Sequence, residues 1–199
     1  MSKRRLSVLR LDLDPLDFMV FSLFGLRYRL CLIASLIFGL GAVGANPTLD
    51  QDKVLAAMAL RVTQFVEYPD DVGEVFAFGV FADRQLFTVL QAILAEGGQF
   101  SNYRAVYLDE RSSVEQLRSL DALLFGNVDI SKVSYVVSRL STRPILLMGA
   151  SGGFLESGGM VNFIKRNKRV AFEINARQAA RHRIEFRAQL LRLAVRVID

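Results

Sequence analysis

Residues that catalyse reactions or bind metals are scarce in this sequence, which has one cysteine, one histidine and no tryptophan among 199 residues. Cys31 lies in an apolar stretch near the N-terminus, so the chain beyond residue 45 has no thiol for a disulfide, a metal site or a nucleophile. His182 stands between Arg181 and Arg183, without a second histidine to complete a metal site. We predict no metal site, and we expect His182 on the surface at a helix end.

The other candidate chemical groups do not form a recognisable cofactor site. Gly152-Gly153 and Gly158-Gly159 lack the spacing and the lysine of a phosphate-binding loop. The carboxylate pairs Asp70-Asp71 and Asp109-Glu110 stand in turn-like sequence, where adjacent side chains diverge into solvent. With one imidazole and no thiol beyond residue 45, the chain is predicted not to be an enzyme and to need no cofactor.

Charge is distributed unevenly beyond residue 45. Residues 160–199 hold ten Lys or Arg and three Asp or Glu, whereas residues 46–159 hold nine and fourteen. Such a basic quarter can meet anionic lipid, nucleic acid or an acidic protein face. Since charged side chains mostly form a solvated surface, we do not expect a nucleic-acid partner.

The N-terminal region has the pattern of an export signal. Arg27-Tyr28-Arg29 precedes the apolar run Leu30–Ala45, which is short for a membrane-spanning helix of about 20 residues. Val43 and Ala45 are the small residues typical of a cleavage site. We predict cleavage after Ala45, which leaves residues 46–199 as one periplasmic domain.

Two alternatives concern how this segment begins and ends. Met19 can serve as the true start, which would leave residues 1–18 untranslated. An uncleaved inner-membrane anchor is favoured slightly by the additional apolar stretch Phe18–Leu26. Every version delivers the following domain to the periplasm.

Helix and strand patterns alternate along the exported part. Thr48 and Gln51 form a capping-box start for a helix from Leu49 to about Val66, which the turn around Pro69 ends. Strands and helices are then expected in turn at Val75–Phe81, Arg84–Ala95, Ala105–Leu108, Ser113–Leu120, Ala122–Phe125, Ser131–Arg139 and Ile145–Met148. This alternation predicts a mostly parallel sheet with flanking helices.

The pattern changes at the C-terminal end. Met160–Ile164 and Arg169–Ile174 are predicted to form a hairpin whose turn is Lys165-Arg166-Asn167-Lys168. Helices are expected at Ala176–His182 and Gln189–Val197. The fold class is therefore a single three-layer α/β domain with a mostly parallel sheet, flanking helices and a C-terminal antiparallel hairpin at one edge.

Four stretches carry a resemblance to the YfiR-like family of periplasmic proteins, over about Lys53 to Val197. Phe65-Val66-Glu67-Tyr68-Pro69 is similar to an F-x-x-[WY]-P element, and Gly158–Phe163 resembles GG-x-[IV]-NF. Val170–Asn175 contains FEIN and Leu190–Ala194 spells LLRLA. The sequence departs from the family where Gly149-Ala150 replaces Ser-Asp, where Phe186-Arg187-Ala188 replaces a Ser-rich stretch, and where the cysteines of the better-known branch are missing, so redox control does not transfer.

The resemblance implies a non-catalytic protein that represses an inner-membrane diguanylate cyclase by contacting its periplasmic portion, and so modulates cyclic-di-GMP signalling. The candidate partner-binding or family-motif residues are Phe65, Tyr68, Pro69, Gly159, Asn162, Phe163, Glu173 and Asn175. Most of them also have a structural interpretation. Phe65 has the spacing of a core residue, the residues from 159 to 163 suit a packed turn, and Asn175 suits a helix cap.

A second hypothesis is a periplasmic small-ligand sensor that acts on another membrane signalling protein or a transporter. A glycine-flanked loop after the fourth strand, Ala150–Phe154, would lie at the carboxyl edge of a parallel sheet, where such folds bind ligands. A small molecule and a second copy of the chain therefore remain open as partners beside the cyclase.

Overall fold

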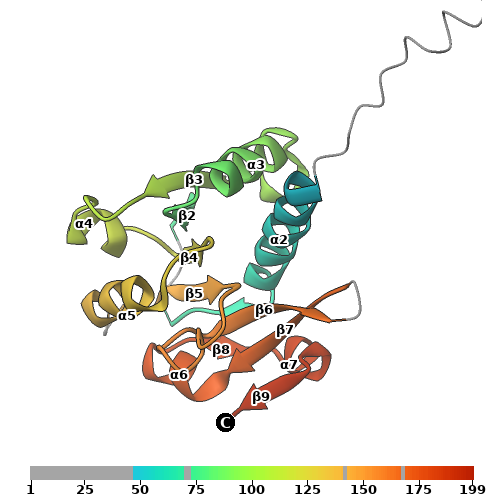
Figure 1. The fold of residues 1–199 in the computed structure, drawn as a ribbon, viewed down its shortest axis with the longest axis vertical. Coiled ribbons are helices and arrows are strands. Elements are labelled where there is room, and N and C mark those ends of the chain that lie inside the picture. The colour runs from blue at the N-terminus through green and yellow to red at the C-terminus, as the bar shows by residue number, and fades with distance from the viewer. Residues whose placement is uncertain (1–46, 70–72, 141–142, 167–168) are drawn as a thin grey trace, which may run out of the picture. The chain divides into compact units, whose positions relative to one another are not determined.

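A seven-stranded sheet forms the centre of the structure (Figure 1). The computed structural model describes residues 47–69, 73–140, 143–166 and 169–199, which belong to one compact unit. The strand order is β3-β2-β4-β5-β6-β7-β9, and β6 and β7 are the antiparallel pair in it. The strands are β2 (Phe76–Phe81), β3 (Tyr103–Leu108), β4 (Ala122–Phe125), β5 (Leu146–Gly149), β6 (Val161–Arg166), β7 (Arg169–Asn175) and β9 (Arg196–Ile198).

The sequence composition explains which strands are central. Every side chain of β2, β4 and β5 is buried, as expected for parallel strands that are covered on both faces. Gly79 in β2 lies so close to Leu120 and Leu108 that a Cβ would sit within 2.8 Å of either. The glycine therefore allows two core leucines to pack against the strand.

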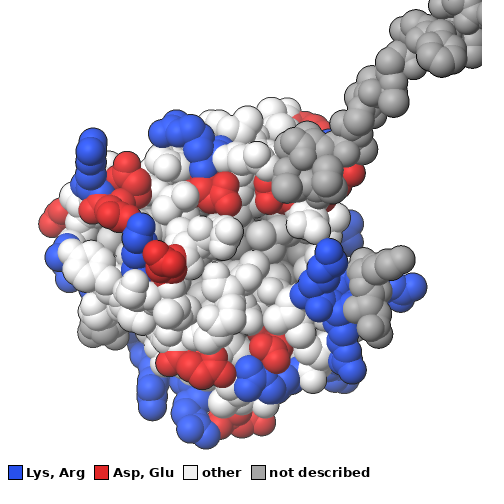
Figure 2. All heavy atoms as spheres, in the orientation of Figure 1, with Lys and Arg blue, Asp and Glu red and all other residues white. Residues whose placement is uncertain are grey.

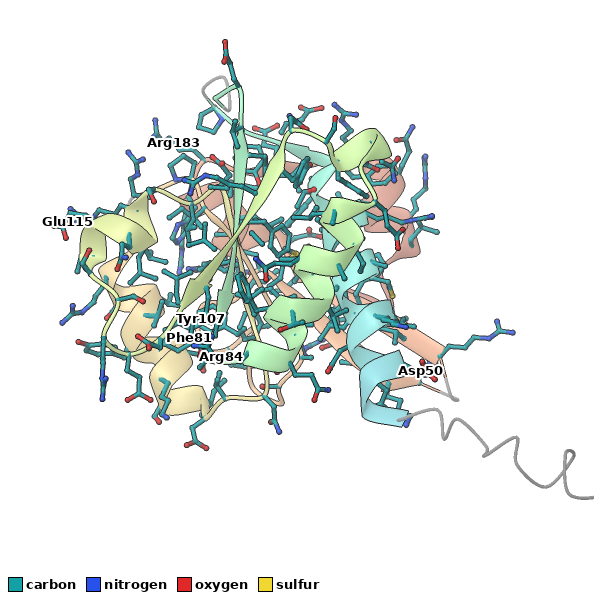
Figure 3. The ribbon with its side chains drawn as sticks, turned by 90° about the horizontal axis from the view of Figure 1, so that it is seen from above. Asp50, Phe81, Arg84, Tyr107, Glu115 and Arg183 are labelled. Atoms are coloured by element: carbon teal, nitrogen blue, oxygen red, sulfur yellow. The ribbon has the colours of Figure 1, made fainter. Side chains whose placement is uncertain are left out.

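Four helices flank these strands: α2 (Pro47–Thr63), α3 (Arg84–Ala95), α4 (Val114–Arg118) and α5 (Ile130–Arg139). Figure 3 shows α2 and α3 on one side of the strands and α4 and α5 on the other. Asp83 caps α3 by accepting from Leu86 N at 2.9 Å, and Ser113 with Gln116 forms a capping box on α4. The predicted fold class is confirmed.

The end of the first helix was predicted too late. Helix α2 ends at Thr63, and Val66–Glu67 form a short strand, β1, that pairs with β8 (Glu185–Phe186) in a separate two-stranded sheet. Thr63 helps to end the helix, because its hydroxyl donates to Leu60 O at 2.6 Å. A two-residue strand paired across more than a hundred positions leaves no periodic signal in the sequence.

The predicted helix Gln189–Val197 is wrong at its C-terminal half. Helix α7 covers Ala188–Leu193, Ala194 is extended, and β9 adds to β7 as a parallel edge strand. The open edge of β7 supplies hydrogen-bond partners, and Val195, Val197 and Ile198 are β-branched residues that favour a strand. The sheet therefore does not end on the predicted antiparallel hairpin.

Two predictions near the hairpin also need correction. Lys165 and Arg166, which were expected in the turn, belong to β6 and pair with Val170 and Arg169. His182 does end helix α6 (Ala176–Arg181), but its side chain is buried rather than exposed. The ring Nδ1 lies 2.9 Å from Arg143 O, which satisfies a polar group inside the protein.

The predicted signal segment, its cleavage after Ala45, the alternative start at Met19 and the Asp70-Asp71 pair lie outside the described residues. In the described part of the chain, no helix has the length and apolar character needed to cross a membrane.

Candidate functional site

The predicted site residues form two groups at opposite ends of the parallel strands. The Tyr68 hydroxyl bonds to Asp121, the residue directly before β4, and so lies at the amino end of that strand. Asn162 pairs with Gly149, the last residue of β5, at the carboxyl end. We call the segment Phe65–Pro69 the amino-edge segment. The hairpin base is the group Gly159, Asn162, Phe163, Glu173 and Asn175.

Tyr68 of the amino-edge segment is held by both its hydroxyl and its ring. The hydroxyl donates to Asp121 O at 3.2 Å, and the ring packs edge-on against Phe76 with centroids 6.0 Å apart. Burial, followed by the Asp121 carboxylate, raises the pKa of Tyr68 well above its ordinary value. Tyr68 therefore stays protonated and serves as a hydrogen-bond donor.

The other two predicted site residues of this segment, Phe65 and Pro69, differ in exposure. Phe65 is half-buried against the core, and its carbonyl accepts from Arg187 N at 3.0 Å. The core interpretation of Phe65 is thereby favoured over a free surface contact. Pro69 is exposed and is the candidate in this segment that a partner can reach most easily.

Asp121 was not among the residues predicted from the sequence, although its hydrogen bonds organise the amino ends of the strands around Tyr68. Its carboxylate accepts from Ala77 N at 2.7 Å, and its carbonyl accepts from Leu146 N at 3.0 Å. Burial raises its pKa, while the Ala77 hydrogen bond and the charges of Arg104 and Arg143 oppose that rise. The sequence did contain a signal for this role, because an aspartate stands directly before a fully apolar strand.

A second polar contact missed from the sequence joins α2 to β3. The Thr63 hydroxyl donates to Leu60 O, so Tyr103 donates to Thr63 across 2.9 Å. Burial raises the pKa of Tyr103, whose ring stacks on Phe76 at 4.5 Å. These contacts hold Phe76, the ring against which Tyr68 packs. The hydroxyls of Thr63 and Tyr103 are bonded to each other, so this pair is structural rather than catalytic.

At the hairpin base, Asn162 and Gly159 hold the loop after β5. Asn162 is buried, and two carbonyl oxygens, Ser151 O and Gly149 O, face the end of its side chain at 3.2 Å. These acceptors assign the amide nitrogen to that position, where it donates to the loop at two points. A Cβ on Gly159 would lie 2.1 Å from the ring of Phe154. Phe163 is itself a buried core residue. The motif thus secures a loop rather than presenting a surface.

Glu173 and Asn175 also have partners within the chain. Glu173 Oε1 and Oε2 accept from Arg196 Nε and Nη2 at 2.9 and 3.2 Å, which links β7 to β9. Asn175 caps α6 by accepting from Gln178 N at 2.9 Å, as its helix-cap interpretation predicted. Its amide also donates to Leu155 O at 3.3 Å. The five hairpin-base residues therefore act together in packing and hydrogen bonding.

A cleft of about 330 Å³ lies at the carboxyl ends of β2 and β3. Glu110 and Lys132 form an ion pair of 2.5 Å at its wall, which raises the pKa of Lys132, and Arg139 covers the Tyr135 ring at 4.4 Å. The cleft occupies the predicted edge of the sheet but is not built from Ala150–Phe154. Its lining is Phe81, Asp109, Glu110, Ser112, Leu117, Ser131, Lys132, Tyr135, Val136 and Arg139.

Residues 149–153 spell the G-x-S-x-G pattern of serine nucleophiles, which our sequence reasoning did not recognise. Ser151 follows the carboxyl end of β5 and continues into turns rather than a helix. His182 bonds to Arg143 O, before the amino end of the same strand. The imidazole therefore lies at the wrong end of β5 to activate Ser151. Within the described ranges, no group of three or more His, Cys, Asp or Glu is arranged to hold a metal ion.

Comparisons with known proteins bear on the whole unit. The sequence model of the YfiR/HmsC-like family matches residues 52–195. Among solved structures, an ABC domain from Streptococcus pneumonia in complex with L-Trp is similar, with a TM-score of 0.54 and 14% identity over 72% of this chain. The match spans 60% of that structure, and at this identity it shows the fold alone. No curated protein matches the sequence.

Proposed function

This chain belongs to the YfiR/HmsC-like family of periplasmic regulators, and from that premise we propose that it represses an inner-membrane diguanylate cyclase by binding the cyclase's periplasmic portion. The family is regulatory rather than catalytic and acts on membrane diguanylate cyclases. The observation that carries the proposal is the family match over residues 52–195, which includes almost the whole described unit. The expected consequence is a lower level of cyclic-di-GMP in cells that export this protein.

Repression of this kind requires the protein to distinguish two states of the cyclase. A partner that binds both states equally shifts no equilibrium, however tightly it binds. To move the cyclase from 99% active to 99% inactive, the inactive state must bind about 10⁴-fold more tightly. The proposed regulator must therefore have a contact surface that fits the inactive state of the cyclase better than the active state.

The amino-edge segment is the best-supported contact surface among the predicted site residues. Pro69 is exposed there, whereas Glu173 and Asn175 of the hairpin base are hydrogen-bonded within the chain. Tyr68 anchors the segment to the sheet through its hydrogen bond to Asp121 O and its ring contact with Phe76. A rigid exposed segment loses little conformational entropy on binding.

The test measures cyclic-di-GMP in cells that lack the gene and in cells complemented with three versions of it. We expect deletion to raise cyclic-di-GMP, the exported protein to restore the lower level, and a version without residues 1–45 to fail. Pro69→Arg should fail to restore the level while it accumulates normally in the periplasm. An unchanged level on deletion would contradict the proposal.

A matched control separates the contact surface from general damage. Asn127 is exposed in the chain that follows β4, at the carboxyl end of that strand and so at the opposite end from the amino-edge segment. Asn127→Arg adds the same positive charge as Pro69→Arg and should restore repression fully. If both variants fail alike, Pro69 is not part of a specific contact.

A small-ligand sensor is the second candidate, and the cleft at the carboxyl ends of β2 and β3 favours it. Its volume of about 330 Å³ is at the lower end of known ligand pockets, roughly 300–1,000 Å³. Lys132 and Glu110 present both charges at its wall, which suits a small zwitterion. A library of amino acids and related small molecules should then raise the melting temperature, and Lys132→Ala should abolish the shift. No shift with any compound would remove this candidate.

A further inference from the structure

The basic residues of the C-terminal quarter fall into two kinds. Arg187 pairs with Glu67 at 3.1 Å, and Arg196 pairs with Glu173 at 2.9 Å. None of the ion pairs in the described part of the chain includes Lys165, Arg166 or Arg169. These three residues, which we call the basic tip, are exposed at the end of the β6–β7 hairpin.

Charge repulsion within the basic tip lowers the stability of the fold. Arg166 and Arg169 are direct register partners across the antiparallel pair, and like charges at such positions repel each other. Figure 2 shows blue side chains gathered on this projecting edge beside the hairpin of Figure 1. None of the ion pairs among the described residues includes Arg166 or Arg169. An anion bound from outside would therefore reduce the repulsion between them.

Two exposed apolar side chains lie on or next to the segment that pairs with β7. Val195 N donates to Phe172 O at 2.9 Å, so Val195 lies beside β7, three residues along that strand from Arg169 of the basic tip. Leu193 is 68% exposed and Val195 is 41% exposed on this stretch. Cationic side chains next to exposed apolar ones are typical of surfaces that bind a lipid interface.

We propose that the basic tip, together with Leu193 and Val195, binds the anionic lipid headgroups of the inner membrane's periplasmic face. Long, exposed Lys and Arg side chains on a two-stranded projection suit a diffuse layer of negative charge better than one fixed partner. Each such residue near an anionic surface contributes about 1 kcal/mol, or about fivefold in affinity. The contact would hold the domain at the surface where its membrane partner lies, and it does not depend on which protein is regulated.

The test uses soluble protein released from the periplasm of cells that express the full gene. Sedimentation with vesicles of phosphatidylcholine containing 30% phosphatidylglycerol should retain the wild type, and pure phosphatidylcholine should not. Replacing all three tip residues by Glu should weaken binding by at least about a hundredfold. Raising the salt concentration should release the wild type in the same way, because exposed charges are screened.

Two controls keep the result specific to the tip. Arg84, Arg111 and Arg118 are exposed near β3, the strand at the other edge of the sheet: Arg84 lies over the ring of Tyr107 in β3 at 4.3 Å, Arg111 follows β3, and Arg118 ends α4. Their joint replacement by Glu changes the net charge equally and should leave vesicle binding nearly unchanged. Arg169→Glu alone should weaken binding while it raises the melting temperature slightly, because it turns a repulsive pair with Arg166 into an attractive one.

Three outcomes would overturn the proposal. The first is a wild type that does not bind phosphatidylglycerol vesicles, and the second is equal loss in both triple variants. The third is a tip variant that still binds vesicles but no longer co-purifies with its membrane partner, since this would assign the tip to an acidic protein face. The two vesicle outcomes do not depend on the cyclic-di-GMP experiment, so the two proposals can fail separately.

Discussion

The two ends of the β6–β7 hairpin use polar residues in opposite ways. At the hairpin base, Asn162, Glu173 and Asn175 each bond to another part of the chain. At the basic tip, Arg166 faces Arg169 without an acidic partner among the described ion pairs. The base resembles the family's motif, whereas the tip is not part of that motif.

This difference separates stability from recognition. Residues that mark a family can do so because they hold a loop and a sheet in place, as Gly159 and Asn162 do here. Charges that oppose each other at a register pair weaken the fold slightly. Such charges indicate a surface shaped for contact with something outside the chain. The following substitutions test the division, beginning with the largest expected effect.

Gly159→Ala should be the most damaging change at the hairpin base. The new Cβ would lie 2.1 Å from the Phe154 ring, which is fully buried. We expect a loss of about 3 kcal/mol from overpacking, or roughly 10 °C in melting temperature. Gly152→Ala in the same loop meets no atom within 4 Å and is the matched control. Equal stability of the two variants would show that the loop after β5 is not tightly packed.

Asn162→Ala should cost about 2 kcal/mol, because the carbonyls of Gly149 and Ser151 lose the donor that a buried side chain supplies. Asn162→Asp should cost more, since a carboxylate would face Gly149 O and Ser151 O. Urea unfolding of both variants measures the difference. A free energy of unfolding within about 0.5 kcal/mol of wild type would contradict the structural role of the motif asparagine.

Tyr68→Phe extends the comparison to the amino-edge segment and should cost about 1 kcal/mol near neutral pH. Because the pKa of Tyr68 is raised in the folded state, folding is favoured below the unfolded tyrosine pKa of about 10 and loses stability as pH rises above it. The phenylalanine variant should therefore show a shallower loss of stability in alkaline buffer. Parallel curves for the two proteins, followed by chemical denaturation from pH 8 upward, would exclude this contribution.

Arg166→Ala should have the smallest effect and the opposite sign. Removal of one guanidinium relieves the repulsion with Arg169, so the free energy of unfolding should rise by about 0.2–1 kcal/mol. Lys165→Ala, on the same strand opposite Val170, should leave stability unchanged. If Arg166→Ala destabilises the protein, the tip contains an attractive contact and the contrast with the base disappears.

The regular elements were predictable wherever local patterns and burial agree. The strand Ala122–Phe125 and the helix Arg84–Ala95 have the bounds that their patterns predicted. The short strands were not predictable, because β1 and β8 have two residues each and exist only through pairing with each other. The buried position of His182 was not predicted for a related reason, since the acceptor of its ring, Arg143 O, lies 39 positions away in the sequence.

By itself, the sequence determined an α/β unit, through the alternation of apolar strands with amphipathic helices, and a family membership carried by ordered motifs. Only the tertiary structure decided what those motif residues do. Hydrogen bonds such as Asn162 to Gly149 and ion pairs such as Glu173 with Arg196 depend on which strands become neighbours. The same neighbour relation placed Arg166 opposite Arg169. Strand pairing brings distant positions within a few ångströms, and that proximity determines whether a charge is satisfied inside the fold or left for a partner.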